Sequence, residues 1–192
     1  MLKTIVHVPT GEFRSPNGGF DCGPFEPQRQ VLSVVNGVTT YDPQGCAQGI
    51  YHEVGHLRLE SLGMHIEGHD NRLILNGPEE LYDSPVRFDK QRPMEACIHG
   101  LYAWIIFTEN DLAVAKWDPT GTCTYLAQNV SKIEKGIVEV ETHVVTTDEG
   151  AAFVTPLLAW GRDIVERSHP LLRATLGEAE YQRLCPSARG AS

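Results

Sequence analysis

Short runs of β-branched and apolar residues dominate the start of the chain, a pattern typical of β-strands. Residues 3–8 form one run, and residues 31–35 and 37–41 form two more around an Asn-Gly dipeptide that favours a hairpin turn. Residues 9–27 are rich in glycine and proline and indicate a long loop. The pattern therefore predicts a small antiparallel sheet at the N-terminus.

After this segment the apolar positions recur at the spacing of helices. The Asp-Pro pair at residues 42–43 is typical of a helix start and Gly63 of a helix end. Residues 64–89 are polar and irregular, which predicts a loop region. Pro93 opens a second helix, which is strongly apolar over residues 96–107.

The second half of the chain predicts further helices. An apolar stripe at helical spacing spans residues 125–137. Thr147 is a typical helix cap, and the helix that it starts is expected to run towards Arg167 with a bend near Pro156. Residues 169–184 predict a last short helix. We therefore expect a mainly α (α+β) fold in which a helical domain carries a small sheet.

A length of 192 residues suits one domain with a real core and is too short for two. We expect that domain to comprise strands and a long loop over residues 1–41, a helical region over residues 42–185 and a mobile tail over residues 186–192. The formal net charge of −9 argues against nucleic-acid or membrane partners, because both need clustered lysine and arginine.

Neither a bilayer-spanning apolar run nor the apolar core of a signal peptide is found, so we expect a cytoplasmic protein. The five cysteines include no C-x-x-C pair, and their odd number favours reduced thiols over a disulfide framework.

The first predicted helix contains an H-E-x-x-H motif formed by His52, Glu53 and His56. On a helix the two histidines lie one turn apart on the same face, so both imidazoles can bind one metal ion. Glu53 lies about 100° around the helix axis, where it can contact a molecule on the metal but is badly placed to be a third ligand. The motif therefore predicts two ligands and one assisting carboxylate.

A catalytic metal needs a third ligand, and the sequence offers three groups of candidates. His65 and His69 belong to the polar segment that follows the helix. Glu79 and Glu80 stand where the gluzincin peptidases carry a glutamate ligand, but turn residues surround the pair. His99 lies near the start of the apolar second helix and is the best candidate, because a buried imidazole requires a polar partner or a metal. A metal site between two helices is thus expected.

The metzincin peptidases are excluded, because their motif continues with a glycine and a third histidine where this chain has Leu59 and Leu62.

The H-E-x-x-H segment and the residues before the second helix resemble a known family, the H-E-x-x-H type peptide β-hydroxylases of peptide natural-product clusters, which depend on iron(II) and 2-oxoglutarate. The resemblance covers Gly49 to Phe107 in detail and extends weakly to Val154, although Lys90-Gln91 adds one residue before the last arginine of the pattern. The matching residues after the motif helix are Ser84, Pro85, Arg87, Asp89, Arg92, Pro93, His99 and Gly100.

The resemblance implies an oxygenase that hydroxylates a side-chain carbon of a peptide or an amino-acid-derived natural product. His52, His56 and His99 would then bind iron(II), leaving room for 2-oxoglutarate and dioxygen. Arginine has the fork of donors that a carboxylate needs, so Arg92, and after it Arg87, are the expected anchors of 2-oxoglutarate.

In this reading Glu53 orients a ligand, a water molecule or the substrate. Tyr102 is expected to contact the substrate from an apolar pocket that excludes water. The overall acidity of the chain favours a cationic or neutral substrate.

Two alternatives remain open. The first is a small zinc peptidase, in which Glu53 takes a proton from the metal-bound water and either His99 or the Glu79-Glu80 pair completes the site. The second is a non-catalytic binding module that a metal stabilises or that contains no metal at all. In that module His99 would face packed core.

Overall fold

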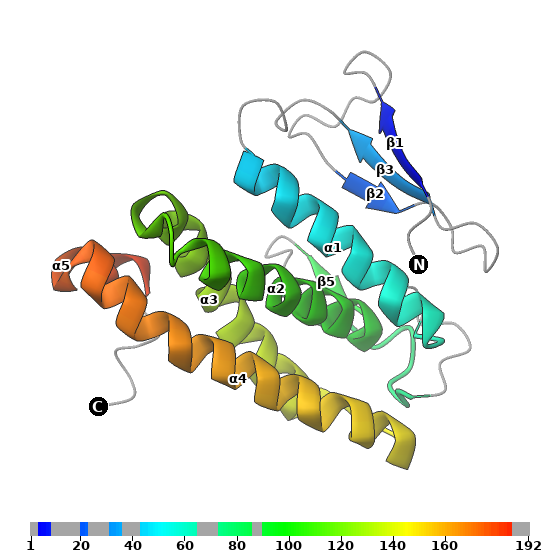
Figure 1. Ribbon diagram of the computed structural model, residues 1–192. Helices are drawn as coiled ribbons and strands as arrows, with labels where there is room; N and C mark the ends of the chain where they lie inside the picture. Colours follow the sequence, from blue (N-terminus) through cyan, green and yellow to red (C-terminus); the bar gives the residue numbers. More distant parts are fainter. Residues whose placement is uncertain are drawn as a thin grey trace.

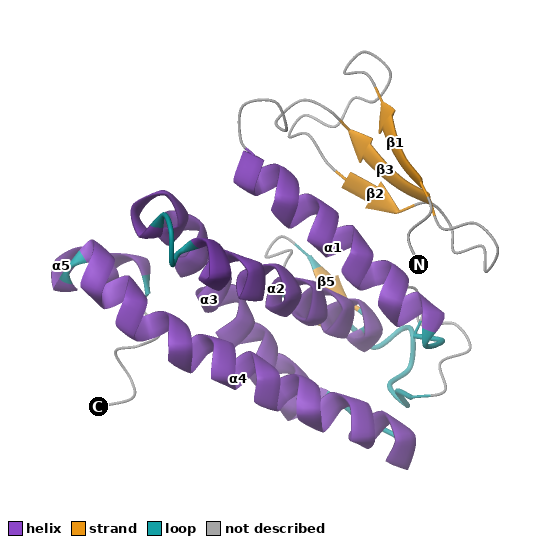
Figure 2. Cartoon of the chain, viewed as in Figure 1, coloured by secondary structure: helices purple, strands orange, loops and turns teal. Residues whose placement is uncertain are grey.

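The structure is a computed structural model, and its description covers six parts of the chain. Only the backbone is described for the three N-terminal strands and for residues 43, 45, 46 and 53. Helices dominate the described structure, as the sequence predicts (Figure 2). The described ranges are residues 4–8, 20–22, 31–35, 43–64, 73–85 and 90–185.

The N-terminal sheet has three strands, β1 (Thr4–Val8), β2 (Phe20–Cys22) and β3 (Val31–Val35). β3 lies in the middle, parallel to β1 and antiparallel to β2, so the predicted sheet is present but mixed, and its β1–β3 pairing departs from the antiparallel prediction. The reason is the long connection between β1 and β3, which gives the chain the length that a parallel pairing needs. β2 forms within the segment predicted as loop, and the predicted strand at residues 37–41 lies outside the described ranges.

α1 (Pro43–Ser61) lies between this sheet and the other helices (Figure 1). It ends as predicted at Gly63, whose φ of 81° is a conformation that a side chain disfavours. The amide of Met64 donates to the carbonyl of Leu59 at 3.1 Å, which closes the helix end. The chain therefore ends α1 at a fixed point shortly after the H-E-x-x-H motif.

α2 (Met94–Val114) is the central helix, and α1, α3 (Pro119–His143) and α4 (Asp148–Leu176) pack around it (Figure 1). The apolar run predicted for α2 explains this position, because most of its residues are buried. The predicted cap of α4 is confirmed, since the Thr147 side chain accepts a hydrogen bond from the amide of Gly150 at 3.1 Å.

α4 is longer than the sequence predicts. It continues through Pro156 and Pro170 without a break, and only Gly177, with a φ of 74°, separates it from α5 (Glu178–Leu184). Both prolines are exposed, so the carbonyl groups that lose a helical donor face water. The predicted end near Arg167 and the separate helix over residues 169–184 are therefore wrong.

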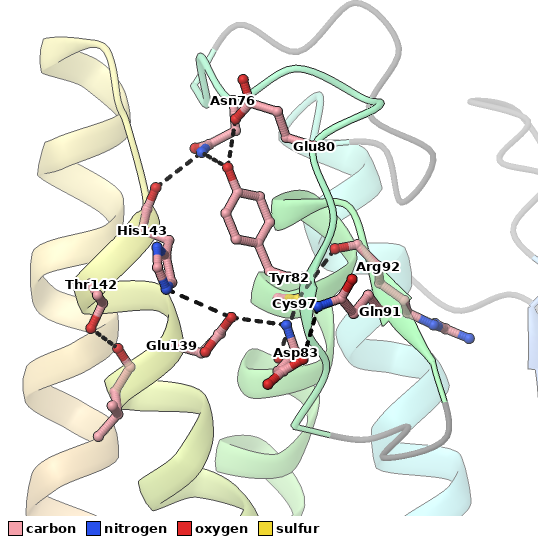
Figure 3. A network of polar contacts seen from close by, with 11 residues as sticks. Asn76, Glu80, Tyr82, Asp83, Gln91, Arg92, Cys97, Glu139, Thr142 and His143 are labelled. Atoms are coloured by element: carbon pink, nitrogen blue, oxygen red, sulfur yellow. Dashed lines mark hydrogen bonds and ion pairs between the residues drawn. The ribbon is translucent and has the colours of Figure 1, made fainter.

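A two-stranded antiparallel hairpin of β4 (Tyr82–Asp83) and β5 (Gln91–Arg92) precedes α2, and β4 lies in the segment predicted as loop. It is held against α3, because the Asp83 amide donates to the Glu139 carboxylate at 2.8 Å (Figure 3). Arg92 thus lies on a strand, β5, whose backbone is held by its pairing with β4.

The buried side chain of Asn76 holds the loop before this hairpin (Figure 3). Its amide nitrogen donates to the Tyr82 hydroxyl at 2.7 Å and to the His143 carbonyl at 3.0 Å, and its oxygen accepts from the Val145 amide at 2.8 Å. One side chain therefore joins the loop to the end of α3.

Within the described ranges no helix has the length and apolar character needed to cross a membrane. Cys97, Cys123 and Cys185 are buried free thiols, whereas the side chains of Cys22 and Cys46 lie outside the described part.

A buried carboxylate, that of Asp111 on α2, joins three helices. It accepts hydrogen bonds from Gln44 and Gln48 of α1, the former at 3.0 Å, and from Asn129 of α3 at 2.7 Å. Its side chain is fully buried, and burial raises its pKa from 3.8 to about 6 despite the three amide donors. Asp111 therefore fixes the first turns of α1 on the bundle.

Replacing Asp111 with Asn is expected to flatten the dependence of stability on pH. In the wild type the folded state holds this proton more firmly than the unfolded state, so the free energy of unfolding rises as the pH falls from 7 to 4. The rise due to this group over that range is about 2 kcal/mol. Denaturant unfolding at a series of pH values measures it. Asp163→Asn, at an exposed position on α4, should keep the wild-type slope, and an equal slope in Asp111→Asn would contradict the assignment.

Candidate functional site

Three histidine rings form a cluster at the contact between α1 and α2. His52 and His56 lie one turn apart on α1, with their Nε2 atoms 2.9 Å apart. His99 of α2 stacks on His56, with 5.2 Å between ring centroids and 3.0 Å between their Nδ1 atoms. The structure thus brings together the three residues that the sequence selects as metal ligands.

The close approach of the two helices at Gly55 makes this cluster possible. A Cβ atom at Gly55 would lie 3.3 Å from the Cα atom of Ala103, tighter than most real contacts. Gly55 lies on the turn of α1 between the two motif histidines, so its missing side chain lets α1 approach the backbone of α2.

The hydrogen bonds of the three rings define one consistent set of tautomers. His99 Nε2 lies 2.7 Å from the carbonyl oxygen of Met64, which only accepts, so this nitrogen carries a proton. His99 Nδ1 is then an acceptor and His56 Nδ1 its donor. His56 Nε2 in turn accepts from His52 Nε2. The cluster is therefore a directed chain of neutral imidazoles that ends on a backbone carbonyl.

Burial keeps the two histidines of α1 neutral. It lowers the pKa of His52 to about 3, with further contributions from His56, His99, Lys132 and Arg92. Burial and then Arg92 lower the pKa of His56 to about 4. His99 is fully buried. Neutral imidazole is the form that binds metal ions, so these rings are ready for coordination at neutral pH.

Two cations lie close enough to act on these histidines. Arg92 lowers the pKa of His52 and of His56, and Lys132 of α3 lowers that of His52. In Figure 3 the side chain of Arg92 extends away from the Tyr82 network and its guanidinium group lies at the edge of that network. Neither Arg92 nor Lys132 forms a side-chain hydrogen bond or ion pair with the described residues. The site is therefore locally positive although the chain is acidic.

Aromatic side chains of α2 connect the histidines to Lys132. The Phe107 ring lies 6.3 Å from His52 and 4.4 Å from Trp104, measured between centroids. The Lys132 ammonium group lies 3.7 Å above the centre of the Trp104 ring. Tyr102, the predicted substrate contact, instead packs against Phe153 and Trp160 of α4.

The cluster fits a metal ion in its chemistry and in part of its geometry. Two nitrogens bound at about 2.1 Å and at right angles to each other are about 3.0 Å apart, close to the 2.9 Å between the Nε2 atoms of His52 and His56. The bond from His99 Nε2 to a carbonyl is the outer contact that metal-bound histidines usually make, which leaves Nδ1 as the ligand atom.

The Nδ1 atom of His99 does not face the point at which one ion could bind His52 and His56. His99 Nδ1 approaches Nδ1 of His56, whereas His52 approaches Nε2 of the same ring. In the described part of the chain no group of three or more His, Cys, Asp or Glu side chains is arranged around one ion position. Binding of one ion by all three rings therefore requires a ring of the cluster to turn.

Several predicted residues cannot be placed. Arg87, His65 and His69 lie outside the described ranges, as does the side chain of Glu53. Glu79 and Glu80 are exposed, and Glu80 accepts a hydrogen bond from the Tyr82 hydroxyl. The described side-chain contact of Glu80 is therefore with the hairpin.

Sequence reasoning missed Lys132 and Met64. Lys132 lies three residues after Asn129 on α3, so the two polar residues share one helix face beside the predicted apolar stripe. This shared face is the only local feature of the sequence that points to Lys132. Met64 acts through its carbonyl group, which no side-chain pattern reveals.

No family model, curated protein or solved structure shows significant similarity to this chain. The resemblance to the peptide β-hydroxylases therefore stays a prediction, and the argument for function depends on the site itself.

Nitrogen NMR of the histidine rings tests the imidazole chain. At neutral pH, without metal, we expect His99 to be the Nε2–H tautomer and His56 the Nδ1–H tautomer. The His56 ring should still be neutral at pH 5, because burial lowers its pKa to about 4. His143, whose ring is exposed, is the control, and His143→Asn should leave both tautomers unchanged. An imidazolium signal from His56 at pH 6, or the opposite tautomers, would contradict this hydrogen-bond chain.

Proposed function

We propose that the protein is an iron(II)- and 2-oxoglutarate-dependent oxygenase that hydroxylates a side-chain carbon of a peptide or of an amino-acid-derived natural product. The observation that carries the proposal is the combination of three adjoining histidines, two of them held neutral by burial, with two cations that have no ion-pair partner in the described ranges. Zinc would be the cofactor if the protein were a peptidase.

His52, His56 and His99 are the proposed metal ligands. Bound to them, iron(II) would supply the activation of dioxygen and leave positions for 2-oxoglutarate. The α1–α2 contact at Gly55 holds the three imidazoles within one helix crossing. Gln44 and Gln48, bonded to Asp111, keep α1 from sliding along α2.

Arg92 is the proposed anchor for 2-oxoglutarate. Three neutral ligands leave the charge of a divalent metal uncompensated, and this suits a co-substrate with two negative charges better than a ligand set with a carboxylate would. The guanidinium group of Arg92 donates no hydrogen bond to the residues that the structure describes, and its charge lowers the pKa of both motif histidines. Arg87 is the second proposed anchor, and Glu53 is proposed to orient a ligand, a water molecule or the substrate.

The apolar side of the site supports chemistry that must exclude water. Phe107 and Trp104 cover the side of α2 between His52 and Lys132, and buried Ile106 lies against the helix contact. Tyr102 can contact a substrate only where this wall continues towards α4.

Local charge favours the oxygenase over the peptidase. A zinc peptidase of the gluzincin type needs a glutamate ligand, and Glu80 is instead bonded to Tyr82. The cations Arg92 and Lys132 beside the histidines are suited to an anionic co-substrate, which peptide hydrolysis does not require.

Anaerobic titration of metal-free protein with iron(II) and then 2-oxoglutarate tests the proposal. We expect a weak visible charge-transfer band, which His99→Ala removes because one ligand is lost. Arg92→Ala should raise the 2-oxoglutarate concentration needed by about tenfold to a hundredfold, because a charged hydrogen bond contributes roughly 1.5–3 kcal/mol.

His143→Ala is the matched control, since this ring is exposed on α3 and the band should be unchanged. Absence of the band from the wild type, together with tight zinc binding and peptide cleavage that Glu53→Gln abolishes, would overturn the oxygenase in favour of the peptidase.

A further inference from the structure

We infer that Lys132 and Trp104 form a binding site for a carboxylate group beside His52. The inference extends the proposed function, on which the position of this site next to a metal depends. The carboxylate belongs either to 2-oxoglutarate or to the substrate that is oxidised.

Lys132 has no counter-ion among the described residues. It is partly buried, and its side chain forms no hydrogen bond or ion pair with any residue that the structure describes. The chain has 25 acidic residues and only 16 lysines and arginines, so a free carboxylate partner was available in the sequence. A partly desolvated ammonium group without such a partner is costly unless a ligand supplies the negative charge.

The ammonium group of Lys132 is held in place by an aromatic ring. It lies 3.7 Å above the centre of the Trp104 ring, a contact that holds the flexible lysine side chain in one orientation. The Nε1–H of Trp104 is buried and has no acceptor in the described part of the chain. A fixed ammonium group beside an unused N–H donor is an arrangement suited to an anion.

Aromatic contacts link Lys132 to the histidines. The Lys132 ammonium group lies over Trp104, the Trp104 and Phe107 ring centroids are 4.4 Å apart, and the Phe107 ring lies 6.3 Å from His52. A carboxylate on Lys132 would therefore place the rest of its molecule near the proposed metal ligands. This inverts the expectation of a cationic or neutral substrate, because the local charge is opposite to the net charge of −9.

The test uses metal-free, ¹⁵N-labelled protein and follows the three tryptophan indole N–H signals. The probes are N-acetylglycine, which carries a carboxylate, and N-acetylglycinamide, its neutral counterpart. We expect N-acetylglycine alone to shift the Trp104 signal in a saturable manner. Trp117, which is 90% exposed, and Trp160, bonded to Glu109 at 3.2 Å, are internal controls and should not shift.

Lys132→Met keeps the apolar stem and removes the charge, and it should raise the dissociation constant of N-acetylglycine at least about tenfold. Lys132→Arg should restore binding. Lys135→Met, at an exposed position of the same helix, should leave it unchanged. Unchanged Trp117 and Trp160 signals show that each variant is folded.

Equal shifts with both probes, or a Trp104 shift that persists in Lys132→Met, would overturn the inference. If the site passes this test, addition of 2-oxoglutarate shows which molecule supplies the carboxylate. Displacement of N-acetylglycine by 2-oxoglutarate assigns the site to the co-substrate, whereas binding of both molecules at once assigns it to the substrate. This binding test uses metal-free protein, so its result does not depend on the iron(II) titration. Saturable binding of N-acetylglycine, together with absence of the charge-transfer band from that titration, would refute the oxygenase and still support the carboxylate site.

Discussion

The contact between Gly55 of α1 and Ala103 of α2 is the constraint on which the candidate site depends. Gly55 lies on the turn between His52 and His56, and the space left by its missing side chain brings α1 to the backbone of α2. At that separation His99 reaches His56 across the helix contact. The buried Asp111, bonded to Gln44 and Gln48, fixes α1 two to three turns before Gly55. Together these contacts set both the spacing and the register of the three histidines.

The electrostatic character of the site follows from the same packing. Burial holds His52 and His56 neutral, so the cluster adds no charge of its own at neutral pH. Arg92 and Lys132 then make the surroundings positive in a chain with a net charge of −9. Such a reversal is costly to maintain within an acidic protein, and a bound anion offsets that cost. The neutral imidazoles, as proposed metal ligands, and two cations without an ion-pair partner among the described residues therefore suit an anionic ligand.

Local signals in the sequence were sufficient for α1 and for the position of His99. Asp42-Pro43 and Gly63 correctly bounded the first helix, and the 3.6-residue period put both motif histidines on one face. Relations between distant segments were not predictable. The parallel pairing of β1 with β3 depends on a crossover, and the place of Lys132 beside Trp104 depends on how α3 packs on α2. Tyr102 was assigned to the site from its neighbours in sequence, yet its ring packs against α4.

His52, His56 and His99 are the proposed ligands of one metal ion, although His56 now separates the other two rings. X-ray absorption spectroscopy at the iron edge, on protein loaded anaerobically with iron(II), measures the number of imidazole ligands directly. We expect three imidazoles in the wild type and two in His99→Ala, with His143→Ala unchanged. Two imidazoles in both the wild type and His99→Ala would contradict the proposal, because His99 would then be a buried residue of the helix contact and not a ligand.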